Sequence, residues 1–323
     1  MKRRWPLLLS LLPLLLGLAV YGHFWRGWAT GFETTLAQWF PGERIAVSGF
    51  PYRLEAELTD VKREVEGATS LGMAAQRLRL NRGPWRPELT VFQGQTVALA
   101  ANAAGLAARV NAASATASLK IMPDREGSDR LARLSILLPA ATGNAGFGPD
   151  FRAANLELHV REIVGAAAPA GPDPSLPPRG QFVMGATGLA IGQGLPIGLD
   201  ADITARGPGR LTDYRGWAQA GGSLDVKMTG RDATGEIFKL DASVVPVGAG
   251  NRLAGTIVTV CPLSVQAALN GSVPPPEQRL RNPVTLALET AIPAPGPVAL
   301  SGLPVDLATR SRRGQLPACP RLR

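Results

Sequence analysis

The sequence predicts a mainly β protein in which an N-terminal transmembrane helix and an amphipathic helix precede a long curved antiparallel sheet or two stacked sheets. Three observations predict this fold class. Beyond residue 42, apolar and polar residues alternate with a period of two in one short run after another. Groups of Gly, Pro and Asn separate these runs, as turns do. The 37 Gly and 28 Pro among 323 residues favour short strands and turns over long helices.

Residues 1–25 predict a transmembrane signal anchor. Three basic residues at positions 2–4 precede residues 5–24, a run without Asp, Glu, Lys or Arg. About 20 apolar residues suffice for a helix to cross a bilayer. Trp25 and Trp28 follow where the aromatic belt of a membrane interface would lie. A cleaved signal peptide also has a basic start and an apolar run, so it remains the alternative.

The basic N-terminus also predicts an orientation. Cytoplasmic flanks of membrane helices carry the excess of Lys and Arg, so the N-terminus is expected in the cytoplasm and the rest of the chain outside. In a bacterial cell this means a single-pass protein of the inner membrane with its body in the periplasm. Membrane lipid is then a partner through the anchor.

Residues 26–41 predict an amphipathic aromatic helix. Phe32, Leu36, Trp39 and Phe40 recur at helical spacing, and Pro41 follows as a stop signal. This apolar stripe either packs on the β domain or lies along the membrane surface, where it would cap a lipid-facing groove. Both interpretations need the same apolar stripe, so the periodicity does not separate them.

The remainder of the chain predicts strands with one buried and one solvated face, which is typical of antiparallel sheets. Apolar positions alternate with polar neighbours, for example at Leu54, Ala56, Leu58, at Leu156, Leu158, Val160, and at Phe238, Leu240, Ala242, Val244. Residues 165–180 (GAAAPAGPDPSLPPRG) are too rich in Pro and Gly for a helix or a central strand. This linker predicts two β-rich halves, 42–164 and 181–323.

Cys261 and Cys319 are the only cysteines. An even pair outside the cytoplasm is often a disulfide, so we expect them to be bonded. The bond would close a long loop, contribute on the order of 4 kcal/mol and tie the last strands to the sheet. A Cys-x-x-Cys motif is absent, which argues against disulfide-exchange catalysis.

The sequence predicts neither catalytic residues nor a metal or cofactor site, and therefore a protein that is not an enzyme. Its two histidines are His23, beside the anchor, and His159, on the solvated face of a strand. Neither lies near a nucleophile-elbow motif, and they do not form a zinc-protease pair. Lys and Arg exceed Asp and Glu by 34 − 25 = 9, but no nucleic-acid-binding motif is present, so nucleic acid is not an expected partner.

Two short segments are distinctive. Residues 47–54 read VSGFPYRL and contain Gly49, Phe50, Pro51, Tyr52 and Arg53; residues 83–88 read GPWRPE and contain Trp85, Arg86 and Pro87. Together with the N-terminal anchor, they resemble domain-of-unknown-function family 2125, envelope proteins of Gram-negative bacteria with no established biochemical role. Residues 302–307 with Gly314 resemble the closing hairpin of the same family. The resemblance covers nearly the whole chain and implies no catalytic residues.

The residues of the first segment, 47–54, also predict its local backbone structure. Gly49 permits backbone geometry that other residues avoid, and Pro51 restricts Phe50 to extended backbone. On a strand, Phe50 and Tyr52 would then share one face and Arg53 the other. The segment is either the corner where a strand starts against the aromatic helix or a site for a ligand or partner.

Two functions remain open. Small Ala and Val side chains on a concave strand face would leave room for acyl chains, so the protein is expected to bind or pass a lipid or another hydrophobic envelope ligand. This expectation also draws on fold-level analogy with anchored β-groove proteins of lipid export. The alternative is a packed structural or interaction protein that scaffolds other envelope proteins.

Overall fold

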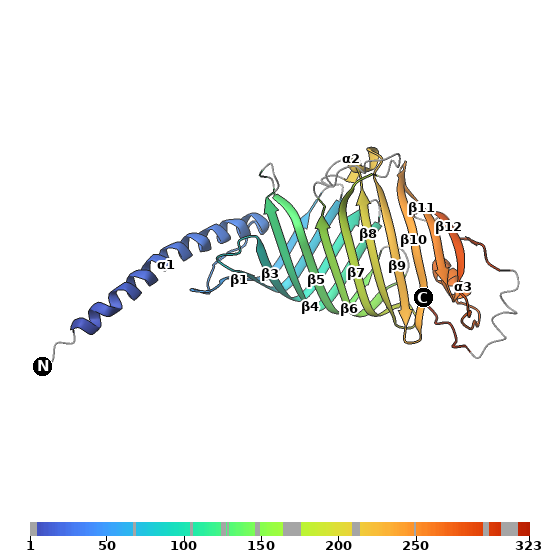
Figure 1. Ribbon diagram of the computed structural model, residues 1–323, viewed down its shortest axis with the longest axis horizontal. Helices are drawn as coiled ribbons and strands as arrows, with labels where there is room; N and C mark the ends of the chain where they lie inside the picture. The colour runs from blue at the N-terminus through green and yellow to red at the C-terminus, as the bar shows by residue number, and fades with distance from the viewer. Residues whose placement is uncertain are drawn as a thin grey trace.

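The chain forms one large antiparallel sheet with a long helix at its N-terminal end (Figure 1). The computed structural model describes residues 5–66, 69–103, 106–123, 127, 129–145, 149–163, 176–208, 214–248, 250–292, 297–304 and 316–323. The helices are α1 (Trp5–Trp39), α2 (Tyr214–Gln219) and α3 (Pro262–Asn270). The strands are β1 (Leu54–Val65), β2 (Thr69–Arg82), β3 (Leu89–Ala103), β4 (Leu106–Pro123), β5 (Asp129–Asn144), β6 (Phe151–Glu162), β7 (Pro178–Ile191), β8 (Ile197–Arg206), β9 (Ser223–Asp232), β10 (Gly235–Val247), β11 (Gly250–Thr259), β12 (Val284–Ile292) and β13 (Leu300–Ser301).

The thirteen strands follow one another in the sheet in sequence order, each antiparallel to the next. The prediction of a mainly β protein with one long antiparallel sheet is confirmed, and the alternative of two stacked sheets is not what the chain forms. The predicted halves also join within this sheet, because β6 pairs directly with β7, with Glu162 opposite Gly180. Of the expected linker, residues 165–175 lie outside the described residues, and its last residues already belong to β7.

The strand register sorts the side chains onto two faces. One row of directly opposed residues crosses twelve strands, and every member is apolar: Ala56, Leu80, Phe92, Ala117, Ile136, Leu158, Met184, Ala201, Met228, Leu240, Ile257 and Leu286. The neighbouring row on the other face contains Glu55, Ser135, His159, Asp202, Lys227 and Asp241. We call the apolar side the inner face; the alternation seen in the sequence produces it.

A one-residue phase shift interrupts the alternation in β1 to β7. Buried or half-buried inner residues lie three apart instead of two at Leu58/Val61, Ala75/Leu78, Gly94/Val97, Ala112/Ala115, Leu138/Ala141, Ala153/Leu156 and Ala186/Leu189. In three of these strands the intervening Asp60, Thr96 and Ala140 have positive φ. Such irregularities bend a strand and increase its twist, so a band of them across seven strands curves the sheet around its inner face. Strict period-two reasoning does not predict this shift.

The helix α1 is one continuous element, whereas the sequence predicted an anchor over residues 1–25 and a separate helix over residues 26–41. The expected boundary followed a change in polarity, and no helix-breaking residue stands there. Figure 1 shows α1 leaving the β1 end of the sheet, with the N-terminus far from the strands. Among the described residues, no helix is both long and apolar enough to cross a membrane. The predicted anchor begins with residues 1–10, whose side chains lie outside the described part of the chain.

Two apolar cores cover parts of the inner face. The first consists of β1 to β3 and the second half of α1, where Ala29, Phe32, Leu36 and Phe40 are buried. The second extends from β4 to β13 and includes α3 and Leu322, next to the C-terminus. The aromatic stripe of residues 26–41 therefore packs on the β domain, as the first of the two interpretations expected.

Candidate functional site

The two cores cover the inner face only in part, and two hollows lie on it. The first encloses about 230 Å³ on strands β2 to β5. All twelve lining residues are apolar or Gly: Met73, Ala75, Leu78, Phe92, Gly94, Val97, Leu99, Ala115, Ala117, Leu119, Leu134 and Ile136. An unpaired polar group would lose its hydrogen bonds to water in such a hollow, so the hollow suits hydrocarbon.

Small residues form the floor of the first hollow. Gly94 and Ala115 lie opposite each other in the register, and Ala117 lies two residues further along β4. A Cβ atom at Gly94 would meet Cγ2 of Val97 at 2.5 Å, so even a methyl group would displace that side chain. The missing side-chain volume at these positions is what leaves the hollow open.

The second hollow encloses about 340 Å³ on strands β5 to β9. Its lining consists of Leu131, Val160, Arg161, Glu162, Gly180, Gln181, Phe182, Ile203, Ala205 and Leu224. Leu134 of the first hollow lies directly opposite Val160 of the second, so the two are neighbours on the same face. We call the two hollows together the inner-face groove. The polar residues in its lining are Arg161, Glu162 and Gln181, at one end of the second hollow. Arg161 and Gln181 hydrogen-bond to each other on the outer face, so Glu162 is the one of the three whose position falls on the inner face.

The helix α1 closes the groove at the β1 end. Trp39 stacks on Phe92, a lining residue of the first hollow, with ring centroids 6.2 Å apart. Beside them the guanidinium of Arg82 lies 4.4 Å from the ring centroid of Phe32 and donates hydrogen bonds to Oγ1 of Thr90. Burial lowers the pKa of Arg82. The cation–π contact between Arg82 and Phe32 holds the second half of α1 on the sheet, and the hydrogen bonds to Thr90 position the guanidinium for it.

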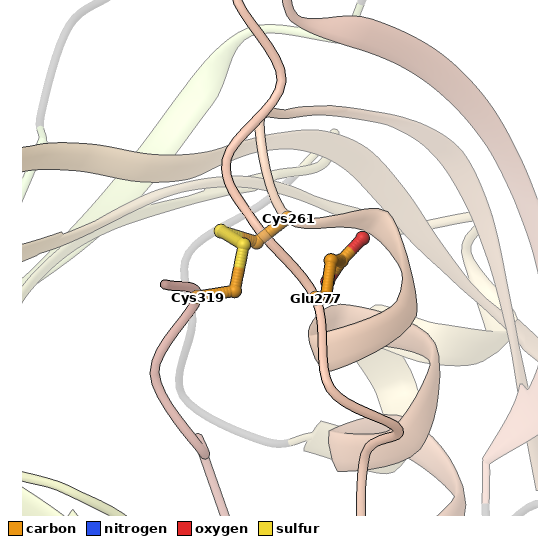
Figure 2. Close-up of side chains that lie close together, drawn as sticks. All are labelled: Cys261, Glu277 and Cys319. Atoms are coloured by element: carbon orange, nitrogen blue, oxygen red, sulfur yellow. A yellow bond between two sulfur atoms is a disulfide. The ribbon is translucent and has the colours of Figure 1, made fainter. Parts of the chain in front are cut away.

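A disulfide joins the C-terminal segment to the residue before α3, at the end of the sheet opposite α1. Cys261 and Cys319 are bonded, as Figure 2 shows, and their Cα atoms lie 5.7 Å apart. Cys261 immediately precedes α3, and Cys319 belongs to the C-terminal segment of residues 316–323. That segment also forms backbone hydrogen bonds with Leu195, Glu277 and Arg279. The bond therefore ties the end of the chain to the sheet beside α3, where the sequence analysis expected it.

Glu277 lies beside the disulfide and is buried (Figure 2). The potential ligand atoms of Cys261, Glu277 and Cys319 lie within 4.8 Å of one another, but the two sulfur atoms are bonded to each other and are not free thiolates. The Glu277 carboxylate accepts hydrogen bonds of 3.0 Å from the backbone N–H groups of Leu263 and Ser264, in the first turn of α3. The group therefore caps a helix, a stabilising position for an anion.

We expect Glu277→Gln to change how stability depends on pH. Burial raises the pKa of Glu277, although the hydrogen bonds from the first turn of α3 oppose this. A carboxyl with a raised pKa stabilises the fold below its unfolded pKa, and this contribution is lost as the pH rises through the folded pKa. Denaturant unfolding at several pH values should therefore show the wild type losing stability relative to Glu277→Gln as the pH rises. The exposed Glu289→Gln is the control, and a relative gain with rising pH would contradict the expectation.

The Gly49–Arg53 segment is a turn before β1, so the expectation that Phe50 and Tyr52 share a strand face is wrong. The backbone N–H of Arg53 donates to the Gly49 carbonyl, which closes the turn. Gly49 has a φ of 98°, and a Cβ atom there would lie 2.9 Å from the Arg53 carbonyl oxygen. Pro51 lies in the middle of this turn, and the chain reverses there instead of extending. The turn contacts α1 through Tyr21, Trp25 and Phe50, as the corner interpretation expected.

The second distinctive segment forms the connection between β2 and β3. Trp85, Arg86 and Pro87 are exposed there, and the N–H of Arg86 donates to the carbonyl of Gly83 within the turn. None of the three lines either hollow of the groove. Of the expected closing hairpin, residues 305–315 lie outside the described residues.

His159 lies on the outer face of β6, where the sequence placed it. Its Nδ1 is 2.9 Å from Oγ of Ser135 on β5, and its Nε2 is 3.8 Å from a carboxylate oxygen of Glu157. The same Ser135 hydroxyl accepts a hydrogen bond from Nε of Arg133. These side chains share the exposed outer face, opposite the groove.

Sequence reasoning did not find the residues that shape the groove. Its floor depends on Gly and Ala at inward positions of β2 to β4, and such small residues give only a weak apolar alternation in the sequence. The signal that could have found them is inward Gly and Ala aligned across neighbouring strands. That alignment requires the register, which the phase shifts change.

The fold and the groove define a class: a single-sheet β protein with an apolar inner-face groove and a helix that closes one end. The chain belongs to the family described as "Uncharacterized protein conserved in bacteria (DUF2125)", whose model matches residues 42–258. This range contains both distinctive segments and both hollows. The resemblance to this family is confirmed, but the match leaves out the N-terminal helix and the C-terminal hairpin that the resemblance was expected to include. Neither the comparison with curated proteins nor that with solved structures finds a match.

Proposed function

We propose that this protein binds the acyl chain of a lipid, or a similar hydrophobic envelope ligand, in the inner-face groove. The observation that supports this is the uninterrupted apolar row across twelve strands, whose members Phe92, Ala117 and Ile136 are only half-buried where they line the first hollow. A large exposed apolar surface is costly in water and usually marks a binding site. The role is binding and not catalysis.

The shape and chemistry of the groove favour a chain over a compact ligand. The first hollow offers no hydrogen-bonding side chain, whereas the far end of the second includes Glu162 at an inner-face position. An elongated molecule with one apolar and one polar end would match this distribution. Its apolar part would lie on the Gly and Ala floor of β3 and β4, and its polar end would lie near Glu162.

We further propose that α1 anchors the protein in the bacterial inner membrane and that the sheet lies in the periplasm. Residues 11–20 of α1 leave their large apolar side chains exposed, and the sheet does not cover them. The disulfide between Cys261 and Cys319 suits an oxidising compartment. The basic N-terminus sets the orientation that this requires.

Filling the groove should abolish ligand binding. Ala117→Phe places a ring on the inner face of the first hollow, whereas Thr116→Phe places the same ring on the outer face, one residue away. We expect native mass spectrometry after mild detergent extraction to find lipid-sized adducts on the wild type and on Thr116→Phe. Ala117→Phe should carry them at a tenfold lower level or less, with the circular dichroism spectrum of the wild type.

Two outcomes would contradict the groove proposal. One is equal adduct levels on both variants, and the other is a wild type without adducts that crosslinks in intact cells to defined envelope proteins. The second result would favour the alternative function, a scaffold for other envelope proteins.

A further inference from the structure

Five aromatic rings gather where α1 meets the Gly49–Arg53 turn. On α1, Tyr21 contacts Trp28 with ring centroids 6.1 Å apart, and Phe24 stacks on Trp28 at 6.3 Å. From the turn, Phe50 contacts Tyr21 at 5.9 Å and Trp25 at 5.4 Å. Residues about thirty positions apart in the chain thus form one cluster. With Tyr52 added, we call these six residues the aromatic collar.

Hydrogen bonds attach the turn to the helix. The Tyr21 hydroxyl donates to the Pro51 carbonyl at 2.5 Å, and Nε1 of Trp25 donates to the Arg53 carbonyl at 3.2 Å. The turn is therefore held beside one particular stretch of α1, residues 21–28. The sheet continues directly from this turn, since β1 begins at Leu54.

Despite this attachment the collar faces outward. Tyr52 is 73% exposed, Phe24 56% and Phe50 47%. Exposed aromatic rings that are held rigidly on the surface mark an interaction site. Arg26 and Arg53, interspersed with these rings, add positive charge to the same surface.

The helix before the collar indicates what covers it. Every residue from Leu11 to Val20 is exposed, so no side of this stretch of α1 is covered. Its Leu and Val side chains occupy about two thirds of the helix circumference, and Pro13 and Gly17 lie on the rest. A partner helix or a protein groove would cover one stripe of such a helix and leave the others in water. Hydrocarbon surrounds a helix on every side, so an all-round apolar surface favours lipid.

We propose that the aromatic collar, including Phe50 and Tyr52 of the β domain, lies at the headgroup level of the bilayer; this rests on the proposed anchoring by α1. Tyr and Trp concentrate at that level because their rings are amphipathic, and Arg beside them pairs with anionic lipid headgroups. The Gly49–Arg53 turn is then a second membrane contact. It holds the β1 end of the sheet at the membrane surface and limits rotation of the sheet about α1.

The test uses the full-length protein in vesicles of phosphatidylcholine and phosphatidylglycerol. Tyr52→Cys, labelled with an environment-sensitive fluorophore after the disulfide has formed, reports on the turn. Thr116→Cys with the same label reports on the exposed outer face of β4. Lipids that carry a nitroxide on the headgroup or the upper acyl chain should quench the label at Tyr52→Cys several-fold more than the label at Thr116→Cys.

Each contrary result has a separate meaning. If the protein floats with the vesicles but both labels are quenched equally, the turn is not at the membrane and this inference is wrong, while anchoring and groove binding stand. If the protein does not float with the vesicles, both the anchoring and this inference are wrong. Adducts on the Ala117 and Thr116 variants in detergent test the groove independently of either result.

Discussion

Removing the disulfide with Cys261→Ala and Cys319→Ala together is expected to lower the free energy of unfolding by about 4 kcal/mol. The bond joins residues 58 positions apart, so its loss frees a long loop in the unfolded chain. Alanine is the appropriate replacement because Cys261 is fully buried, and a serine hydroxyl there would have to find a partner.

Denaturant unfolding measures this change, and reduction of the wild type with dithiothreitol should reproduce it. The folded protein should also become sensitive to proteolysis at its C-terminal segment, residues 316–323, which the bond holds beside α3. A change below about 1 kcal/mol in the double variant would show that the packing of Leu322 and the backbone hydrogen bonds hold the segment without it.

The second large effect concerns a buried ion pair. Nη2 of Arg279 lies 2.6 Å from a carboxylate oxygen of Asp232, and the two side chains are only 9% and 16% exposed. Nη1 of Arg279 also donates to the Glu236 carbonyl, so this residue ties the segment after α3 to the turn between β9 and β10. Arg279→Ala leaves Asp232 buried without its cation, and we expect a loss of about 3–5 kcal/mol in the free energy of unfolding.

The matched control is Arg252→Ala. Its partner is Glu289, and both side chains of that pair are more than half exposed. Exposed pairs contribute about 1 kcal/mol or less, so the control should unfold nearly as the wild type does. Equal losses in the two variants would contradict the assignment of Arg279 as a buried tie.

The pair also predicts a pH signature. Burial acts to raise the pKa of Asp232, but hydrogen bonds from Thr234 and Arg279 and the charge of Arg279 outweigh it, so the pKa lies below its ordinary value. A depressed carboxyl contributes stability above its unfolded pKa and loses it as the pH falls through the folded pKa. Arg279→Ala should therefore flatten the loss of stability in acid that the wild type shows.

Much of the sheet was accessible to sequence reasoning because each strand records its environment in its own residues. The alternation at Phe238, Leu240 and Ala242 reports one solvated and one buried face regardless of which strands are neighbours. The pairing of Cys261 with Cys319 needed only a count, since two cysteines allow a single intramolecular bond. The helical spacing of Phe32 and Leu36 likewise identified the stripe that α1 buries.

Other features depend on how separate elements meet. The phase shifts at Asp60, Thr96 and Ala140 look like ordinary polar or small residues in the sequence, yet they curve the sheet and align Gly94 with Ala115. The division of residues 1–41 into two helices failed for a related reason, because polarity changes at residue 25 while the backbone continues unbroken.

The sequence alone determined that this chain alternates into a pleated, two-faced sheet and that an apolar helix leads it, because side-chain period and local backbone preference are properties of neighbouring residues. The structure was needed to show that thirteen strands form one sheet and that its small inward residues align into a groove. It was also needed to show that the Gly49–Arg53 turn contacts Tyr21 and Trp25. The physical reason is that register, curvature and docking are set by contacts between residues distant in the chain, and no local pattern encodes their distances.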